Sequence, residues 1–365
     1  MQAVPAEARG RLAPREVPLL TADLPGTGGC VRVAPEDFRV EEIPLYPASG
    51  SGDHLFLKIE KIGCNTQDVV RGLSRLLTVR ERDVGVAGLK DRRAVAVQTV
   101  SAPLLPRIPA EEQVARAASL AGEGFRVLSA ALHGNKLRTG HLSGNRFEIV
   151  VRACVPDAVA RAERIAAVLR ARGAPNLFGP QRFGRRGDNA ALGAAILRRE
   201  ANVRDRFLRK LALSALQAEL FNRCLAARLA DGLFGRAIRG DVLRKRASGG
   251  LFVCQDPDTD ARRIESAEID PAGPLVGHAL FAAADEARSR EESVVADAGV
   301  DPATFAVGGG ELLGARRPYR IPAADLEIRS AGPDSLLLGF TLPPGGYAAS
   351  IVREIVKAPA DDPGE

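Results

Sequence analysis

The octapeptide at residues 87–94 reads Ala-Gly-Leu-Lys-Asp-Arg-Arg-Ala and places one acid, Asp91, between Lys90 and Arg92. Adjacent cations favour the ionised form of a carboxylate, which can act as a nucleophile or as a base. Residues at strand spacing lie on both sides, at Val84, Val86, Val95, Val97 and Thr99. We therefore expect Asp91 on a turn or at a strand end. The side chain of the neighbouring Lys90 is expected to point to the other side, away from a pocket formed around Asp91. A solvated turn would have the same composition, so a catalytic role depends on the accompanying residues.

Four further stretches combine aromatic rings with glycine, asparagine or arginine, although aromatic residues make up only 4% of the chain and tryptophan is absent. They cover residues 31–38, 144–147, 175–184 and 345–354. Their rings are those of Phe38, Phe147, Phe178, Phe183 and Tyr347. Rings interleaved with Arg and Asn suit base stacking, hydrogen bonding to base edges and phosphate contact. For Phe178 and Phe183, packing in a core beside a turn is an equally good interpretation.

The distribution of charge favours a polyanionic partner. The formal net charge is +6 and the pI is about 9.3. Between Arg161 and Lys210, thirteen Lys or Arg residues stand against four acids, whereas residues 256–301 are acidic. Such asymmetry is typical of a protein that binds nucleic acid on one side. Within the basic region, Arg182, Arg185 and Arg186 are candidate RNA-binding residues.

Several other classes of protein and site are not indicated by the sequence. No apolar run reaches membrane-spanning length, and residues 1–20 lack the apolar segment of a secretory signal. The five cysteines show no C-x-x-C spacing, and the four histidines lack the spacing of metal ligands. We therefore expect reduced thiols, a cytoplasmic location, no membrane association, no bound metal and no cofactor.

The pattern along the chain predicts an α+β fold with strands near both ends and helices in the middle. Strands are expected over residues 31–43, 54–62, 125–132 and 147–151, and a hairpin over 326–342. Helices are expected over residues 66–77, 157–172, 204–229 and 347–357. Residues 255–315 show only moderate helical patterning.

This order of elements indicates one domain into which a second, more helical α+β domain is inserted. We place the host domain at residues 27–172 and 317–365, and the insertion at residues 173–316. Residues 1–26 are rich in proline and alanine, and they are expected to form a loose N-terminal arm.

The octapeptide around Asp91 and the four aromatic stretches, in order from about Val31 to Lys357, resemble the TruD family of tRNA pseudouridine synthases. The resemblance implies a pseudouridine synthase domain with a mixed, largely antiparallel sheet, interrupted by a family-specific insertion domain. It also implies that uridine, at position 13 of tRNA, is isomerised to pseudouridine. The partner would then be tRNA, with no cofactor, and no protein partner is implied.

The same resemblance implies roles for individual residues. Asp91 would be the catalytic aspartate, and the uridine pocket would be lined by Phe38, Asn145, Phe147 and Tyr347. Arg32 stands where the family commonly has Lys, and it would hold the carboxylate ionised. The sequence leaves open whether Asp91 attacks C1′ or removes the 2′ proton. It also leaves open a non-catalytic tRNA-binding protein on the same scaffold.

Overall fold

The structure is a computed structural model that describes residues 16–305 and 312–357. The chain divides into two compact units. The sheet unit comprises Leu24–Ala171, Pro322–Ala348 and Ile355–Glu365, and the helical unit comprises Met1–Asp23, Arg172–Ile321 and Ala349–Glu354. The insertion expected at residues 173–316 lies within the central segment of the helical unit.

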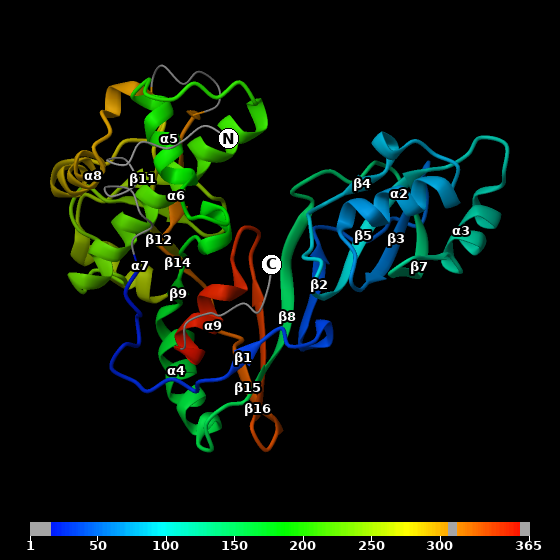
Figure 1. The fold of residues 1–365 in the computed structure, drawn as a ribbon, viewed down its shortest axis with the longest axis horizontal. Helices are drawn as coiled ribbons and strands as arrows, with labels where there is room; N and C mark the ends of the chain where they lie inside the picture. The colour runs from blue at the N-terminus through cyan, green and yellow to red at the C-terminus, as the bar shows by residue number, and fades with distance from the viewer. Residues whose placement is uncertain (1–15, 306–311, 358–365) are drawn as a thin grey trace. The chain divides into compact units, whose positions relative to one another are not determined.

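The sheet unit is built on one ten-stranded sheet (Figure 1). Eight strands follow one another in the order β15 (Glu327–Gly332), β16 (Ser335–Leu342), β8 (Leu142–Arg152), β2 (Phe38–Pro44), β5 (Val95–Pro103), β3 (His54–Lys61), β7 (Phe125–His133) and β6 (Ala121–Gly122). Two short strands pair at the side, β1 (Cys30–Val31) with β8 and β4 (Gly85–Val86) with β5. Among the described strands of this sheet, only β2 and β5 run parallel. The expected mixed, largely antiparallel sheet is therefore confirmed.

One helix of the sheet unit, α2 (Thr66–Leu76), covers part of the sheet. It begins where predicted, and the Asp68 carboxylate accepts a hydrogen bond from the Asn65 N–H at 2.9 Å. Its apolar stripe packs on the buried residues of β3 in a cluster that includes Leu55, Leu57, Ile59, Val69, Val70 and Leu73. The 3.6-residue period of α2 and the two-residue period of β3 thus bury each other. The unit also contains α3 (Ala110–Ala118) and α4 (Ala158–Arg172).

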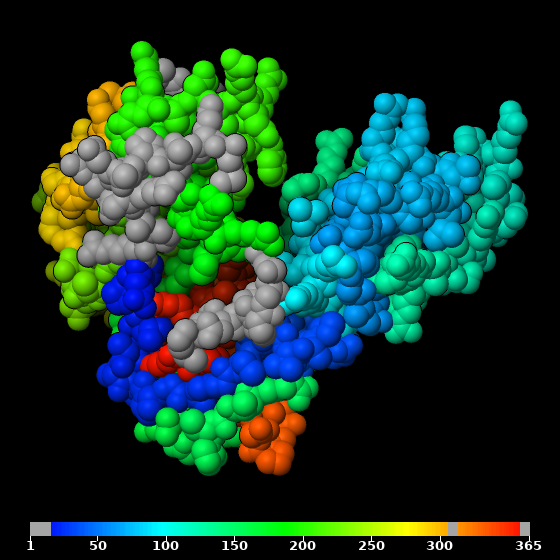
Figure 2. Space-filling view, viewed as in Figure 1, coloured from blue at the N-terminus to red at the C-terminus, as the bar shows by residue number. Residues whose placement is uncertain are grey.

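The N-terminal segment differs from the loose arm expected over residues 1–26. Residues 1–15 lie outside the described residues, but Thr21 is buried. The carboxylate of Glu354, in α9 (Ala348–Val356), accepts hydrogen bonds from the Leu20 N–H at 2.8 Å and from the Thr21 hydroxyl at 2.7 Å. Farther along, the Thr27 N–H donates to the Ile355 carbonyl at 2.9 Å, and Figure 2 shows the dark-blue segment beside red α9. A buried carboxylate at the chain's far end thus holds the described part of this segment.

The helical unit contains two central helices, α5 (Asn189–Leu197) and α6 (Arg206–Ala230), together with α7 (Pro257–Glu265) and α8 (Asp285–Asp297). Its four-stranded sheet has the order β11 (Leu251–Val253), β10 (Val242–Lys245), β12 (Ile269–Leu275) and β13 (Ala315–Pro318). Two short strands, β9 (Ala174–Pro175) and β14 (Arg320–Ile321), pair with each other. No helix among the described residues is long and apolar enough to cross a membrane.

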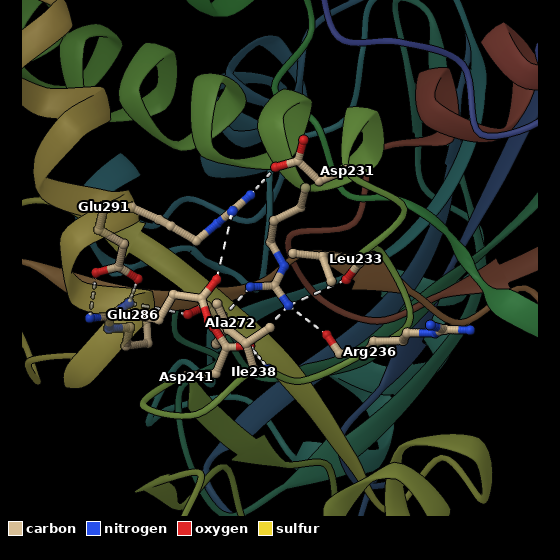
Figure 3. Close-up of polar contacts among 11 residues, drawn as sticks. Asp231, Leu233, Arg236, Ile238, Asp241, Ala272, Glu286 and Glu291 are labelled. Atoms are coloured by element: carbon tan, nitrogen blue, oxygen red, sulfur yellow. Dashed lines mark hydrogen bonds and ion pairs between the residues drawn. The ribbon is translucent and has the colours of Figure 1, made fainter. Parts of the chain in front are cut away.

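Buried ion pairs join the elements of the helical unit. Arg228 of α6 makes two hydrogen bonds to the Asp241 carboxylate, at 2.8 and 2.9 Å, and both side chains are buried. Figure 3 shows the same guanidinium reaching the carbonyls of Leu233 and Arg236. A second pair joins Glu291 of α8 to Arg316 of β13. Such pairs fix geometry, because a buried charge that loses its partner is costly.

Candidate active site

Asp91 lies on the loop between β4 and β5, where a turn or a strand end was expected. The backbone of this loop is held by a hydrogen bond from the buried side chain of Lys61. Lys61, the last residue of β3, is fully buried, and its ammonium group donates to the Asp91 carbonyl at 2.5 Å and to the Cys64 carbonyl at 2.9 Å. Burial lowers the pKa of Lys61, while the nearby Cys64 and Asp91 oppose this effect. The backbone at Asp91 is thereby fixed without using its carboxylate.

A buried ion pair anchors the residue before Asp91. The Lys90 ammonium lies 2.6 Å from the Glu42 carboxylate, with the two side chains 5% and 1% exposed. The Lys90 N–H also donates to the Thr66 hydroxyl at 3.0 Å. The interpretation of the octapeptide as a solvated turn is therefore wrong for Lys90. Lys90 anchors the loop because its cation is paired inside the protein with Glu42. Glu42 lies on β2, the strand that also carries Phe38.

Arg32 contacts the carboxylate of Asp91. Its Nη2 lies 2.9 Å from Asp91 Oδ2, and the side chains are 25% and 50% exposed. The guanidinium carbon also lies 4.3 Å from the centre of the Phe38 ring. Arg32 has a φ of 59°, in the left-handed region that non-glycine residues rarely adopt. The predicted charge pair of Arg32 and Asp91 is thus present, although the two residues are far apart in the sequence.

Three aromatic rings form a row beside this ion pair. The ring of Phe147 packs edge-on against Phe38 at 5.9 Å and is stacked on Phe340 at 5.4 Å. All three are buried. They come from the adjacent strands β2, β8 and β16, in which Phe147 lies directly opposite Phe340. The start of β2 is tied down by Asp37, whose pKa is lowered by its hydrogen bonds to Arg152.

Asn145 precedes Phe147 by two residues on β8, so both side chains are on the same face of the sheet. The carboxamide oxygen of Asn145 is buried and accepts no hydrogen bond from the described residues. A buried acceptor without a donor is costly, by about 1–3 kcal/mol. This oxygen therefore has unused acceptor capacity among the described residues. The other predicted pocket residue, Tyr347, is 41% exposed in the loop between β16 and α9.

The three arginines predicted to bind RNA do not share one environment. Arg182 is half-buried and donates to the Ser214 hydroxyl. Arg185 and Arg186 are exposed in the loop before α5. Nearby, Phe178 and Phe183 are buried in the core of the helical unit, so core packing is the correct interpretation of these two rings.

Sequence reasoning missed two residues that shape the site, Lys61 and Glu42. Both occupy inward positions of a two-residue alternation. In β3 the inward series ends in a lysine, after Leu55, Leu57 and Ile59. In β2 it ends in a glutamate, after Phe38 and Val40. A charged residue at an apolar position is rarely buried without a partner, so this pattern could have identified both. No group of three or more His, Cys, Asp or Glu residues in the described chain is arranged to hold a metal ion.

We predict that breaking the Glu42–Lys90 pair destabilises the protein strongly. Glu42→Leu leaves the Lys90 cation buried without a counterion, which costs about 3–5 kcal/mol of unfolding free energy. The neighbouring Glu41 provides a control, because its pair with Lys58 is about half exposed on both sides. Glu41→Leu is expected to cost about 1 kcal/mol or less. Urea denaturation measures both effects, and equal losses would show that the pair is not effectively buried.

A second prediction concerns the pH dependence of stability. The pKa of Lys61 is lowered in the folded protein from its ordinary value near 10.5. Between the folded and the unfolded pKa, the unfolded chain binds more protons, so stability rises with pH in this window. Relative to Lys61→Met, which cannot titrate, the wild type should therefore gain stability as the pH is raised from neutral toward 10. A free-energy difference that does not change with pH would contradict the burial of a charged Lys61.

The chain is similar to known proteins over nearly its whole length. The family model "tRNA pseudouridine synthase D (TruD)" matches residues 16–204 and 201–355. A tRNA pseudouridine synthase D of Anaeromyxobacter sp. strain Fw109-5 is 50% identical, covering 95% of this chain and 98% of the relative. One of Thermus thermophilus is 42% identical, covering 96% of this chain and 94% of the relative.

The fold has a counterpart among solved structures. The crystal structure of a candidate tRNA pseudouridine synthase D from Methanosarcina mazei aligns with a TM-score of 0.77 and 22% identity, covering 98% of this chain and 99% of that one. At this identity the likeness concerns the fold alone. Since the family model and the relatives both span nearly the whole chain, the protein belongs to the TruD family of tRNA pseudouridine synthases.

Proposed function

We propose that the protein isomerises a uridine of tRNA, at position 13, to pseudouridine, with Asp91 as the catalytic carboxylate. Membership of the family supports the reaction. One observation carries the assignment of Asp91: its half-exposed carboxylate lies 2.9 Å from Arg32 on a loop held by buried side chains. A fixed backbone with an accessible, charge-paired carboxylate is the arrangement that such a reaction requires.

The reaction breaks the N1–C1′ bond of uridine and joins C5 to C1′. The C5 hydrogen is then lost, and N1 gains a proton, so the product is an isomer and no redox partner is consumed. The carboxylate of Asp91 either attacks C1′ or removes the 2′ proton, and both steps require its ionised form. Arg32 contacts Oδ2 of this carboxylate at 2.9 Å and can hold it in one orientation.

The uracil ring requires recognition once it has left the RNA stack. The buried Asn145 oxygen is suited to accept the N3–H of uracil, because it lacks a donor among the described residues. Phe38 and Phe147 would border the pocket with their accessible edges, since most of each ring is buried. Tyr347 has more exposed surface and is the better candidate for stacking on the base.

The partner is tRNA, and we expect the reaction in the cytoplasm and without a cofactor. Its phosphates require distributed cations. Of the predicted arginines, Arg185 and Arg186 fit this role because they are exposed, whereas Arg182 is engaged with Ser214. Arg182 therefore contributes more to the structure of this loop than to RNA binding.

The first test of this function follows the C5 hydrogen. A tRNA transcript with tritium at uridine C5 should release tritium to water when mixed with the protein alone. In Asp91→Asn the neutral amide is a poor nucleophile and a poor base, so release should fall below detection. Binding of tRNA should survive, because it depends on many separate cations.

An Asp91→Asn variant that releases tritium at the normal rate would remove Asp91 from the mechanism. A wild-type protein that binds tRNA but releases no tritium would instead indicate a non-catalytic RNA-binding protein. Mapping pseudouridine in the product tRNA would identify the modified position.

A separate prediction concerns RNA binding by the helical unit. Reversing two exposed charges, Arg185→Glu with Arg186→Glu, should weaken tRNA binding and flatten its dependence on salt by about one unit of log–log slope per lost phosphate contact. The control is Arg107→Glu with Arg116→Glu, which makes the same charge change at exposed positions of the sheet unit. Equal salt slopes for both double variants would exclude a specific role for the loop at Arg185.

A further inference from the structure

Leu89, two residues before Asp91, has an unusual environment. Its side chain is 80% exposed, more than any other large hydrophobic side chain in the described chain. Val33, next to Arg32, is 58% exposed. The Arg32–Asp91 ion pair ties together the two segments that carry these side chains. Single exposed leucines are common on protein surfaces. Leu89 differs from them in how firmly its loop is held.

The loop that carries Leu89 is fixed on both sides of it. Before it, Ala87 is buried, and its carbonyl accepts a hydrogen bond from the Gly140 N–H at 2.9 Å. After it, Lys90 is held by Glu42 and Thr66, and the Asp91 carbonyl is held by Lys61. The exposed position of Leu89 is therefore imposed by its neighbours, since the flanking residues cannot turn it inward without breaking buried contacts.

The proposed reaction leaves a gap in the base stack of the RNA near this position. A base must leave its stack to bring C1′ to a carboxylate, and its departure leaves a gap between its former neighbours. Proteins that unstack nucleic acid often insert an apolar side chain, such as leucine, between the bases. Leu89 is apolar, rigidly presented and next to the carboxylate, and the exposed Arg92 and Arg93 follow on the same loop.

We propose that Leu89 enters the base stack of the tRNA and occupies the space vacated by the target uridine, so that the uridine stays in the pocket. Leu89 is thus a positioning residue that contacts the bases flanking the target. Arg92, whose Nε donates to the Gly63 carbonyl at 2.9 Å, and Arg93 are exposed cations that suit the phosphates beside these bases. This proposal rests on the proposed function, because it assigns Leu89 a role in the same reaction.

The test uses single-turnover tritium release from two transcripts. One is an intact tRNA, and the other carries an abasic nucleotide next to the target uridine, so that its stack is already broken. Leu89→Ala should slow release from the intact transcript about tenfold to a hundredfold, while the Kd for tRNA stays within about threefold. On the abasic transcript, Leu89→Ala should match the wild type within about threefold. Leu89→Met should restore most of the rate because it keeps a large apolar side chain.

Val159→Ala is the matched control, because Val159 is an exposed apolar residue of α4 in the same unit. It should leave both rates unchanged. Thermal unfolding of Leu89→Ala should resemble that of the wild type, since little buried surface is lost. A normal rate of Leu89→Ala on the intact transcript, or an equal loss on both transcripts, would overturn the proposal. If the wild type releases tritium from neither transcript, the proposed function itself fails, and this proposal fails with it.

Discussion

The buried ammonium group of Lys61 is the interaction on which the geometry at Asp91 depends. A cation taken out of water must be surrounded by acceptors, and here these are the carbonyls of Asp91 and Cys64. Because both carbonyls converge on one Nζ atom, the two loops that carry them cannot move independently. The Glu42–Lys90 pair adds a second anchor one residue away. The protein thus uses buried charges to hold the backbone, which leaves the Asp91 carboxylate half exposed for chemistry.

The register of the strand pairing fixes which candidate site residues lie next to one another. Pairing places one row of residues opposite one another across five strands, namely Lys61, Ala96, Val40, Phe147 and Phe340. The next row contains Glu42, Asn145 and Leu342. On this face α2 covers β3, and the strands β2, β8 and β16 carry Phe38, Asn145, Phe147 and Phe340. A slip of one residue in β2 would move Phe38 and Glu42 to the opposite face together.

Local periodicity predicted the elements that bury one regular face, such as α2, β3 and the β15–β16 hairpin. It missed α5, which is buried on nearly all sides and therefore has no apolar stripe, and β12, in which Pro271, Gly273 and Pro274 interrupt the alternation. The position of Asp91 between two strands could be predicted from its neighbours alone. Its contact with Arg32 spans 59 positions of sequence, so no local pattern could predict it, and it came from the family resemblance. Lys61 and Glu42 were detectable as charges in apolar register, but their partners were not.

The planar guanidinium of Arg32 contacts both the Asp91 carboxylate and the Phe38 ring. The guanidinium contacts the Asp91 carboxylate at 2.9 Å while its carbon lies 4.3 Å from the Phe38 ring centre. A guanidinium can stack on a ring and donate to a carboxylate in the same fixed geometry, whereas an ammonium group is a point charge that cannot do both in this way. Arg32 also adopts a left-handed backbone conformation, which needs support from its surroundings. Because the Phe38 ring is only 6% exposed and packs against Arg32 and Phe147, its main role is to orient the arginine. The aromatic row therefore reaches the carboxylate through Arg32, because Phe147 packs on Phe38, Phe38 on Arg32, and Arg32 pairs with Asp91.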